Sequence, residues 1–149
     1  MTINVLANDS DPAGSGAGVG KDPDNSSLTD LVIFDTPNND TLNGGSGDDL
    51  MTGGSTAYDN NLKALDADLK EWSRTDRTYA QRAADIETGS GYAASFPWSA
   101  KTVFSAAVPP DFLNGGTGMD MFYYDPTPIG GISDVVTHFK TGEIKVDIT

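Results

Sequence analysis

The sequence predicts a mainly β protein: a short parallel β-roll that carries an inserted helical hairpin and ends in a C-terminal β-hairpin cap. Three observations lead to this prediction: a glycine-rich segment that occurs twice, a helical pattern between its copies, and alternating apolar residues near the end of the chain. The expected segments are an N-terminal strand and flexible loop (1–34), a first coil (35–52), a helical insertion (53–105), a second coil (106–124) and a C-terminal β cap (125–149).

The repeated segment reads DTLNGGSGDDLMTGG at residues 40–54 and DFLNGGTGMDMFYY at residues 111–124. In each copy two aspartates lie nine residues apart, and the glycines between them fall at the same positions. This is the nonapeptide spacing in which six residues form a turn and three form a short strand. A pair of ordinary Gly/Asn/Asp hairpin turns is the simpler reading, but turn chemistry alone does not require a shared aspartate period.

The residue types in these turns suit a hard cation. Glycine permits positive φ angles and leaves carbonyl oxygens uncovered by a Cβ atom, while aspartate adds carboxylate oxygens. An all-oxygen shell is the one that Ca²⁺ prefers, and the chain has no cysteine to attract a softer metal. Calcium is therefore the expected cofactor. The candidate ligands are Asp40, Asn43, Gly45, Gly47 and Asp49 in the first copy, and Asp111, Asn114, Gly116, Gly118 and Asp120 in the second.

Both copies resemble the hemolysin-type calcium-binding repeats of RTX proteins. Two clear nonamers match, at residues 44–52 and 115–123, and a degenerate nonamer precedes each of them. The resemblance implies an RTX-type solenoid in which successive turns hold calcium between them, and a chain that folds only when calcium is present. It also implies the C-terminal region of a large secreted bacterial surface protein, exported without a cleaved leader.

The two coils are expected to stack directly on one another, with the helical insertion extending out between them. Calcium would then lie between the turns of Asp40 and Asp111 at one end of the strands, and between those of Asp49 and Asp120 at the other. A register shifted by one turn is the alternative. The apolar residues two positions after these aspartates should point into the core between two sheets; they are Leu42, Leu113, Met51 and Phe122.

The remaining segments carry simpler patterns. Residues 2–6 and 28–36 are rich in β-branched residues and are predicted to be strands. Residues 59–74 place apolar side chains three and four positions apart and predict an amphipathic helix, with a shorter helix at 76–88. The apolar stripe of the helix at 59–74 is Leu62, Leu65, Leu69 and Trp72. Trp98 is also expected in the core. A solvated charged face is expected from Asp66, Asp68, Glu71, Arg74, Asp76 and Arg77.

Residues 130–149 predict a β-hairpin, because DVVTHF and EIKVDIT alternate around residues 140–142. This segment also resembles the one that closes many RTX arrays. The resemblance departs at His138, where that family usually has aspartate, so His138 is expected to be a surface residue.

Composition narrows the possible functions. The formal net charge of -13 argues against nucleic acid or an anionic membrane as partner. No stretch approaches the ~20 apolar residues of a membrane span, so no membrane insertion is expected. One histidine and no cysteine exclude a Cys/His dyad and a multi-histidine zinc site, and no GxSxG or P-loop motif is present. We therefore expect no enzyme.

The leading interpretation is an extracellular calcium-binding structural module, part of a secreted or cell-surface protein. Extracellular modules of this kind bind calcium at about 10⁻⁴ to 10⁻³ M. Two alternatives stay open. One is a self-assembling filament or biofilm-matrix subunit, linked by strand addition through the terminal strands TINVL and EIKVDIT. The other is the non-catalytic tail of a secreted hydrolase or adhesin.

Overall fold

The computed structural model describes residues 32–33, 41–105, 110–127 and 133–149, and the strand expected at residues 2–6 lies outside them. The strands and helices are, in chain order, β1 (Val32–Ile33), β2 (Thr41–Asn43), β3 (Leu50–Thr52), β4 (Gly54–Thr56), α1 (Leu62–Trp72), α2 (Tyr79–Thr88), β5 (Val103–Ser105), β6 (Phe112–Asn114), β7 (Met121–Tyr124), β8 (Val135–Thr137) and β9 (Ile144–Asp147). A short 3₁₀ helix, Gly91–Ala93, lies between α2 and β5.

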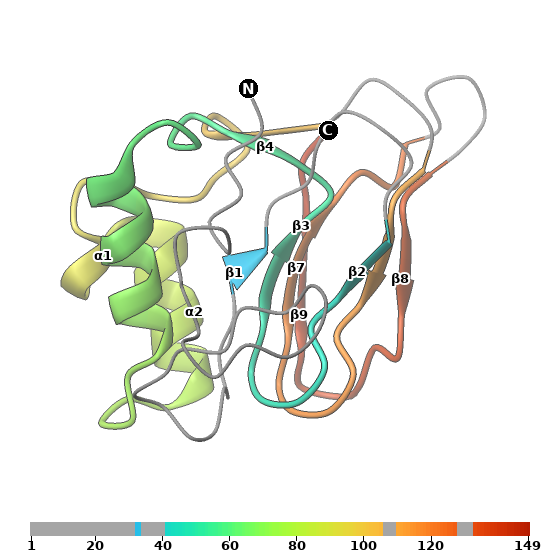
Figure 1. The fold of residues 1–149 in the computed structure, drawn as a ribbon, viewed down its shortest axis with the longest axis horizontal. Helices are drawn as coiled ribbons and strands as arrows, with labels where there is room; N and C mark the ends of the chain where they lie inside the picture. The colour runs from blue at the N-terminus through green and yellow to red at the C-terminus, as the bar shows by residue number, and fades with distance from the viewer. Residues whose placement is uncertain (1–31, 34–40, 106–109, 128–132) are drawn as a thin grey trace, which may run out of the picture.

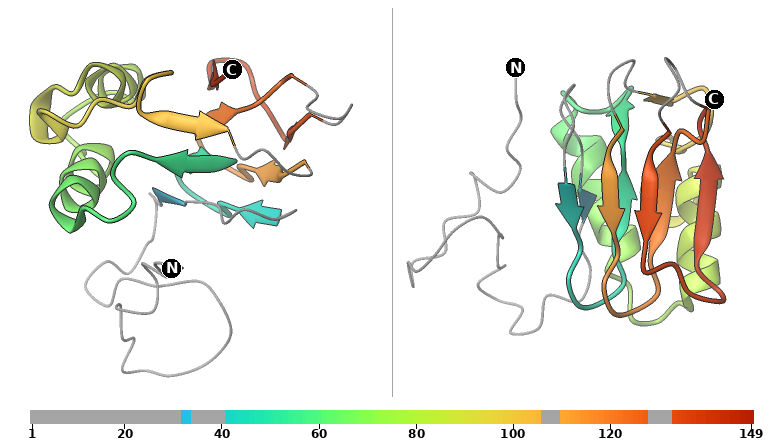
Figure 2. Two further views of the ribbon diagram at one scale, coloured as in Figure 1. Left: turned by 90° about the horizontal axis from the view of Figure 1, so that it is seen from above. Right: turned by 90° about the vertical axis from the view of Figure 1, so that its right-hand side faces the viewer.

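The strands divide among three open sheets. A four-stranded parallel sheet has the order β1-β3-β7-β9, and a three-stranded parallel sheet has the order β2-β6-β8. The third sheet is the antiparallel pair β4-β5. The two parallel sheets face one another, and both helices cover the other side of the four-stranded sheet (Figures 1 and 2). The molecule therefore has three layers.

This architecture shows that the predicted fold class is wrong. The prediction was a short parallel β-roll of the RTX solenoid type, but the described strands form separate open sheets, and no closed or solenoid sheet is found among them. A solenoid stacks a short unit that repeats along the chain. Here the connections are unequal, because residues 53–111 separate β3 from β6 whereas residues 125–134 separate β7 from β8. The helices also supply a complete layer of the core.

The predicted C-terminal β-hairpin cap is wrong as well. Strands β8 and β9 do not pair with each other: β8 pairs in parallel with β6, and β9 in parallel with β7. A tight hairpin turn would have kept both strands in one sheet. The turn has six residues instead, 138–143, with positive φ at His138 and Gly142, and it carries the chain from one sheet to the other.

The two copies of the repeated segment lie side by side, as their shared spacing predicted. Thr41 pairs with Phe112 and Leu50 with Met121, both in parallel. The apolar residues expected between the sheets form one buried cluster, which confirms that prediction; the cluster is Leu42, Met51, Leu113 and Phe122. Alternate residues of β3 and β7 pack instead toward the helices, so these two strands are buried on both faces.

Both helices form within the segments that the apolar pattern predicted, but each is shorter. Helix α1 begins after Asn61, whose side chain accepts a hydrogen bond from the Ala64 N–H. Asp59 is used in the preceding turn, where its carboxylate accepts from Thr56. Helix α2 begins with a capping box between Thr78 and Gln81.

The buried face of α1 differs from the predicted stripe. Leu62 and Leu69 are 68% and 44% exposed, while Asp68 and Glu71, expected in solvent, are fully buried. Each buried carboxylate has a hydrogen-bond donor: Trp98 Nε1 lies 2.9 Å from Asp68 Oδ2, and a main-chain N–H lies 2.6 Å from Glu71 Oε2. Hydrophobic spacing alone could not reveal these donors, because they come from the loop after α2.

Asp68 makes the core sensitive to pH. Burial raises the pKa of Asp68 from its usual 3.8 to about 7, although the hydrogen bond from Trp98 opposes the shift. Its second oxygen, Oδ1, is buried without a hydrogen-bond partner among the described residues. Because the folded-state pKa lies above the unfolded one, the neutral carboxyl favours folding below pH 3.8, and this contribution is lost as the pH rises through about 7.

Asp68→Asn should therefore weaken the pH dependence of stability. Asparagine stays neutral and can still accept the hydrogen bond from Trp98. In the presence of a chelator, the melting temperature of the wild type should fall between about pH 4 and pH 7, and that of the variant should fall less. Equal slopes for the two proteins would show that Asp68 does not titrate in this range.

Candidate cation-binding site in the stacked turns

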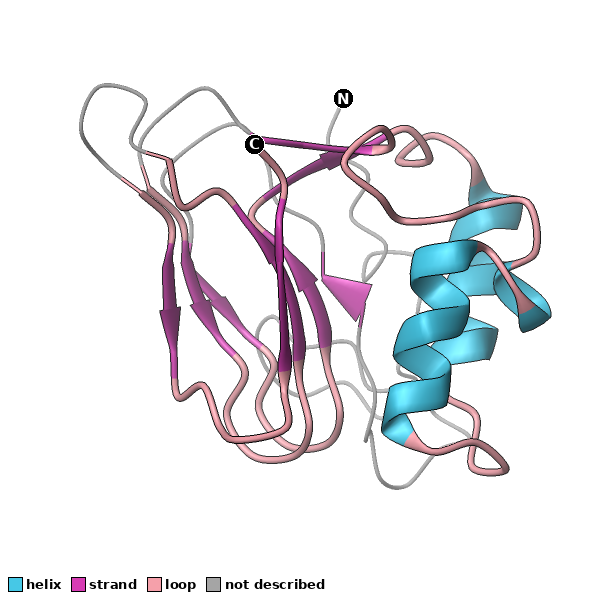
Figure 3. Ribbon diagram, turned by 180° about the vertical axis from the view of Figure 1, so that it is seen from behind, coloured by secondary structure: helices cyan, strands magenta, loops and turns pink. Residues whose placement is uncertain are grey.

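Three six-residue turns connect the three-stranded sheet to the four-stranded sheet at one edge of the molecule (Figure 3). We call them the first turn (44–49), the second turn (115–120) and the third turn (138–143). The flanking strands pair in register, so equivalent positions of successive turns lie next to one another. Eight of the ten predicted ligands lie in, or immediately before, the first and second turns.

Main-chain contacts hold the first two turns together. The Gly47 N–H donates to Thr117 O at 2.8 Å, and the Thr117 N–H donates to Gly45 O at 2.9 Å. A Cβ atom on Gly116 or Gly118 would overlap the carbonyl oxygen of Gly45 or Gly47, respectively. Glycine is required at these two positions because carbonyl groups of the first turn press directly against the second.

Asp49 and Asp120 end the first and second turns, and both are buried. Each carboxylate folds back over its own turn, since a Cβ atom on Gly44 or Gly115 would overlap its Oδ2 atom. Asp120 Oδ1 also accepts a hydrogen bond from the Asp49 N–H at 3.0 Å. The first glycine of each GG pair therefore makes room for the aspartate that follows five residues later.

The electrostatic environment of Asp120 disfavours its charged form. Burial raises the pKa of this carboxyl, and the nearby Glu143 raises it further, while the Asp49 N–H and Lys140 act in the opposite direction. A cation placed next to Asp120 would relieve this unfavourable charge.

Lys140 supplies such a charge between the second and third turns. Its Nζ atom lies 3.1 Å from Gly118 O, 3.2 Å from Glu143 Oε1 and 3.8 Å from Asp120 Oδ2. Between the first and second turns the equivalent oxygens come from Gly47 and Asp49, but the residue in the place of Lys140 is Thr117. The sequence analysis did not select Lys140 or Glu143, because the third turn lacks the GGxGxD pattern.

The two asparagines lie at the ends of β2 and β6, immediately before these turns. Asn114 Nδ2 donates to Asn43 Oδ1 at 3.0 Å, so the two amides bind each other.

Asp48 is a further residue of the first turn that the sequence pattern did not select. Its carboxylate accepts from the Met119 N–H at 2.8 Å and forms an ion pair with Arg82 of α2, and its carbonyl oxygen accepts from Trp72 of α1. Asp48 thus connects the turns to both helices.

Asp111 lies apart from these residues, at the opposite end of the strands. Its N–H donates to Asp134 Oδ1 at 3.1 Å, and the Asp125 N–H donates to Asp134 Oδ2 at 2.8 Å. Burial raises the pKa of Asp134. Asp40, the expected partner of Asp111 in a calcium site, lies outside the described residues, so the predicted pairing of these two turns stays a prediction.

The donors at the stacked turns are all oxygen atoms, which fits a hard divalent cation. Within the described parts of the chain, however, no group of three or more acidic, histidine or cysteine side chains is placed to hold a metal ion. The two aspartates would therefore need main-chain carbonyl groups to complete the shell. The carbonyl groups of Gly45 and Gly47 lie in the contact between the first and second turns.

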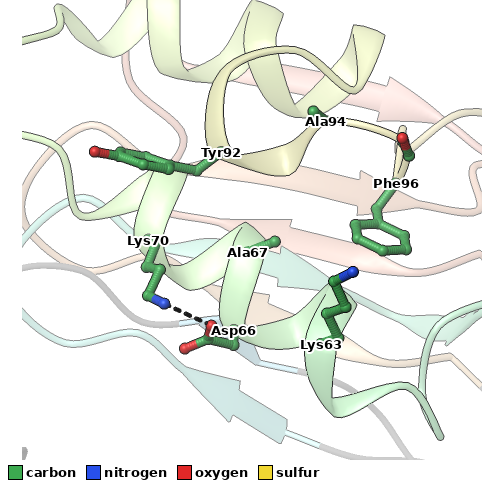
Figure 4. A pocket seen from close by; sticks show the side chains of 8 residues that line it. Lys63, Asp66, Ala67, Lys70, Tyr92, Ala94 and Phe96 are labelled. Atoms are coloured by element: carbon green, nitrogen blue, oxygen red, sulfur yellow. Dashed lines mark hydrogen bonds and ion pairs between the residues drawn. The ribbon is translucent and has the colours of Figure 1, made fainter.

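A shallow pocket lies elsewhere, between α1 and the loop that follows the 3₁₀ helix (Figure 4). Lys63, Lys70, Tyr92 and Phe96 are among its lining residues. The Lys70 ammonium is bound to Asp66 at 2.7 Å, and both side chains are about 60% exposed. The pocket therefore has no buried polar group that would orient a ligand.

Comparisons with protein-family models, with curated proteins and with solved structures gave no match. None of the helices in the described ranges has the length and apolar character that crossing a membrane requires.

Contact between the turns can be tested with two glycine variants. Both Gly45 and Gly118 have positive φ angles, of 98° and 129°, but a Cβ atom has no neighbour within 4 Å at Gly45 and overlaps Gly47 O at Gly118. Gly45→Ala should therefore cost only backbone strain, about 1 to 2 kcal/mol. Gly118→Ala should cost roughly 1 to 3 kcal/mol more in free energy of unfolding, because the turns must separate. Equal losses in denaturant titrations would show that the turns are not in close contact.

Proposed function

We propose that this chain is a non-catalytic structural module that binds calcium between its first and second turns and is stabilised by it. The observation that carries this proposal is the placement of two buried carboxylates, Asp49 and Asp120, at the ends of two stacked turns whose glycine carbonyl groups pack against one another. Burial and the nearby Glu143 raise the pKa of Asp120 even though Lys140 lies 3.8 Å from its carboxylate. The likeness of the turns to hemolysin-type calcium-binding repeats supports the same cation.

A cation at this position would act on the whole core. The first turn leads into β3, and the second leads into β7, the two strands buried between the helices and the three-stranded sheet. Asp48 of the first turn binds Arg82 of α2. Any ligand that binds only the folded chain stabilises it, so calcium would hold the turns and the strands that they position. It would also reduce the self-repulsion of a chain with a formal net charge of -13.

The proposed setting is extracellular, in a secreted or cell-surface protein. Sites built from few carboxylates and from carbonyl groups bind calcium weakly, and extracellular modules work at about 10⁻⁴ to 10⁻³ M. Calcium is abundant at that level outside cells.

Self-association through a terminal strand is a second candidate. Strands β8 and β9 lie at the ends of the two parallel sheets, so each has one edge without a partner strand among the described residues. Such edges are templates for strand addition. Val135 of β8 and Phe139 of the third turn are 37% and 44% exposed. A calcium-stabilised filament would use the same turns, with assembly as a further step.

Calcium titration of a chelated sample tests the proposal. At about 10 mM calcium, binding at roughly 10⁻⁴ M should raise the melting temperature by on the order of 5 to 10 °C. Magnesium should have a smaller effect, because it loses its water ligands reluctantly. Light scattering on the same samples would report growth to large particles if the edges assemble.

The matched variants are Asp49→Asn with Asp120→Asn, which removes the two buried carboxylates, and Asp66→Asn with Glu87→Gln, which removes two exposed charges from the helices. The first pair should abolish the response to calcium, and the second should keep it. The proposal would be contradicted if calcium did not change the melting temperature of the wild type, or if both double variants responded equally to calcium.

A further inference from the structure

We propose that the Lys140 ammonium is a tethered cation that fills the gap between the second and third turns, so that calcium is confined to the gap between the first and second. This inference rests on the proposed function, because it assigns each of the two gaps its own cation. It concerns a residue that the repeat pattern does not include.

Three oxygens surround the ammonium, as they would surround a metal ion. Two are at hydrogen-bonding distance, Gly118 O at 3.1 Å and Glu143 Oε1 at 3.2 Å, and the third is Asp120 Oδ2 at 3.8 Å. The oxygens come from both turns, so the ammonium bridges the gap. One is a main-chain carbonyl of a glycine and two are carboxylates, the same combination that the neighbouring gap offers to calcium.

Both the main chain and the side chain of Lys140 bind the carboxylate of Glu143. Its main-chain N–H donates to Glu143 Oε2 at 2.7 Å, while its Nζ atom binds the other oxygen of the same carboxylate. Glu143 is thus fixed by two contacts within one turn. The Lys140 side chain is 40% exposed, whereas those of Asp120 and Glu143 are fully buried, so the ammonium closes the gap from the solvent side.

The charges of the second and third turns favour a cation here. Asp120 and Glu143 occupy equivalent positions of adjacent turns, and two buried carboxylates so close to one another repel each other. Tyr79 of α2 also faces this region, but its hydroxyl is neutral and donates to the main-chain carbonyl of Asp120. Among the described residues, Lys140 places its ammonium within 4 Å of both carboxylates.

In the first and second turns, the positions equivalent to Lys140 hold no basic residue. The position of Lys140 is taken by Thr117 in the second turn and by Ser46 in the first. Neither hydroxyl carries a charge. Among the described residues, the gap between the second and third turns is thus bridged by a lysine of the chain, and by our proposal calcium takes the equivalent place between the first and second turns.

Lys140→Gln tests this assignment, with Lys101→Gln as the matched control because Lys101 is exposed and outside the turns. Both substitutions remove one positive charge. In chelator, Lys140→Gln should melt on the order of 5 °C below Lys101→Gln, since the two carboxylates then lack a counter-charge. In calorimetric titration with CaCl₂, Lys140→Gln should bind one more ion per chain than the wild type, whereas Lys101→Gln and Lys140→Arg should bind the same number.

Identical behaviour of Lys140→Gln and Lys101→Gln, in melting temperature or in the number of ions, would overturn the inference. So would a Lys140→Gln protein that stays unfolded at every calcium concentration, because a metal ion should be able to replace the ammonium. The proposed function fails separately, if the wild type binds no calcium. In that case a loss of stability and a gained calcium site in Lys140→Gln would still support the role of Lys140.

Discussion

Close contact between the main chains of the stacked turns is the constraint on which the rest of the structure depends. Gly116 and Gly118 allow the carbonyl groups of the first turn to approach the second, and Gly44 and Gly115 make room for the carboxylates that end each turn. This arrangement sets the register of β2 with β6 and of β3 with β7. The same contact brings the buried carboxylates of Asp49 and Asp120 onto adjacent turns, and by our proposal calcium offsets their charge.

In the helical layer, hydrogen bonds stabilise the buried carboxylates. Asp68 and Glu71 are buried in α1, and each receives a donor from the loop that follows α2. Asp48 joins this layer to the turns through Arg82. Buried carboxylates are thus stabilised in three ways in one small protein: by a neutral donor at Asp68, by a protein cation at Glu143 and, by our proposal, by calcium between the first two turns.

The sequence predicted local features better than the arrangement of the strands. The inter-sheet cluster around Leu113 and Phe122 follows from alternation, and the stacking of the copies follows from their shared spacing. The hairpin prediction failed because alternation in the last segment is equally compatible with two strands in different sheets. Asp68 was misplaced because its donor, Trp98, lies 30 residues away. Lys140 was overlooked because its role depends on the turn stacked against it.

The most direct test is to locate the cation. In crystals grown with calcium, the anomalous difference map should show a peak between the first and second turns, about 2.3 to 2.6 Å from carboxylate oxygens of Asp49 or Asp120 and from a glycine carbonyl. No peak should lie between the second and third turns, where Lys140 is bound. A map without a peak between the first two turns, in crystals that contain calcium at millimolar concentration, would contradict the account.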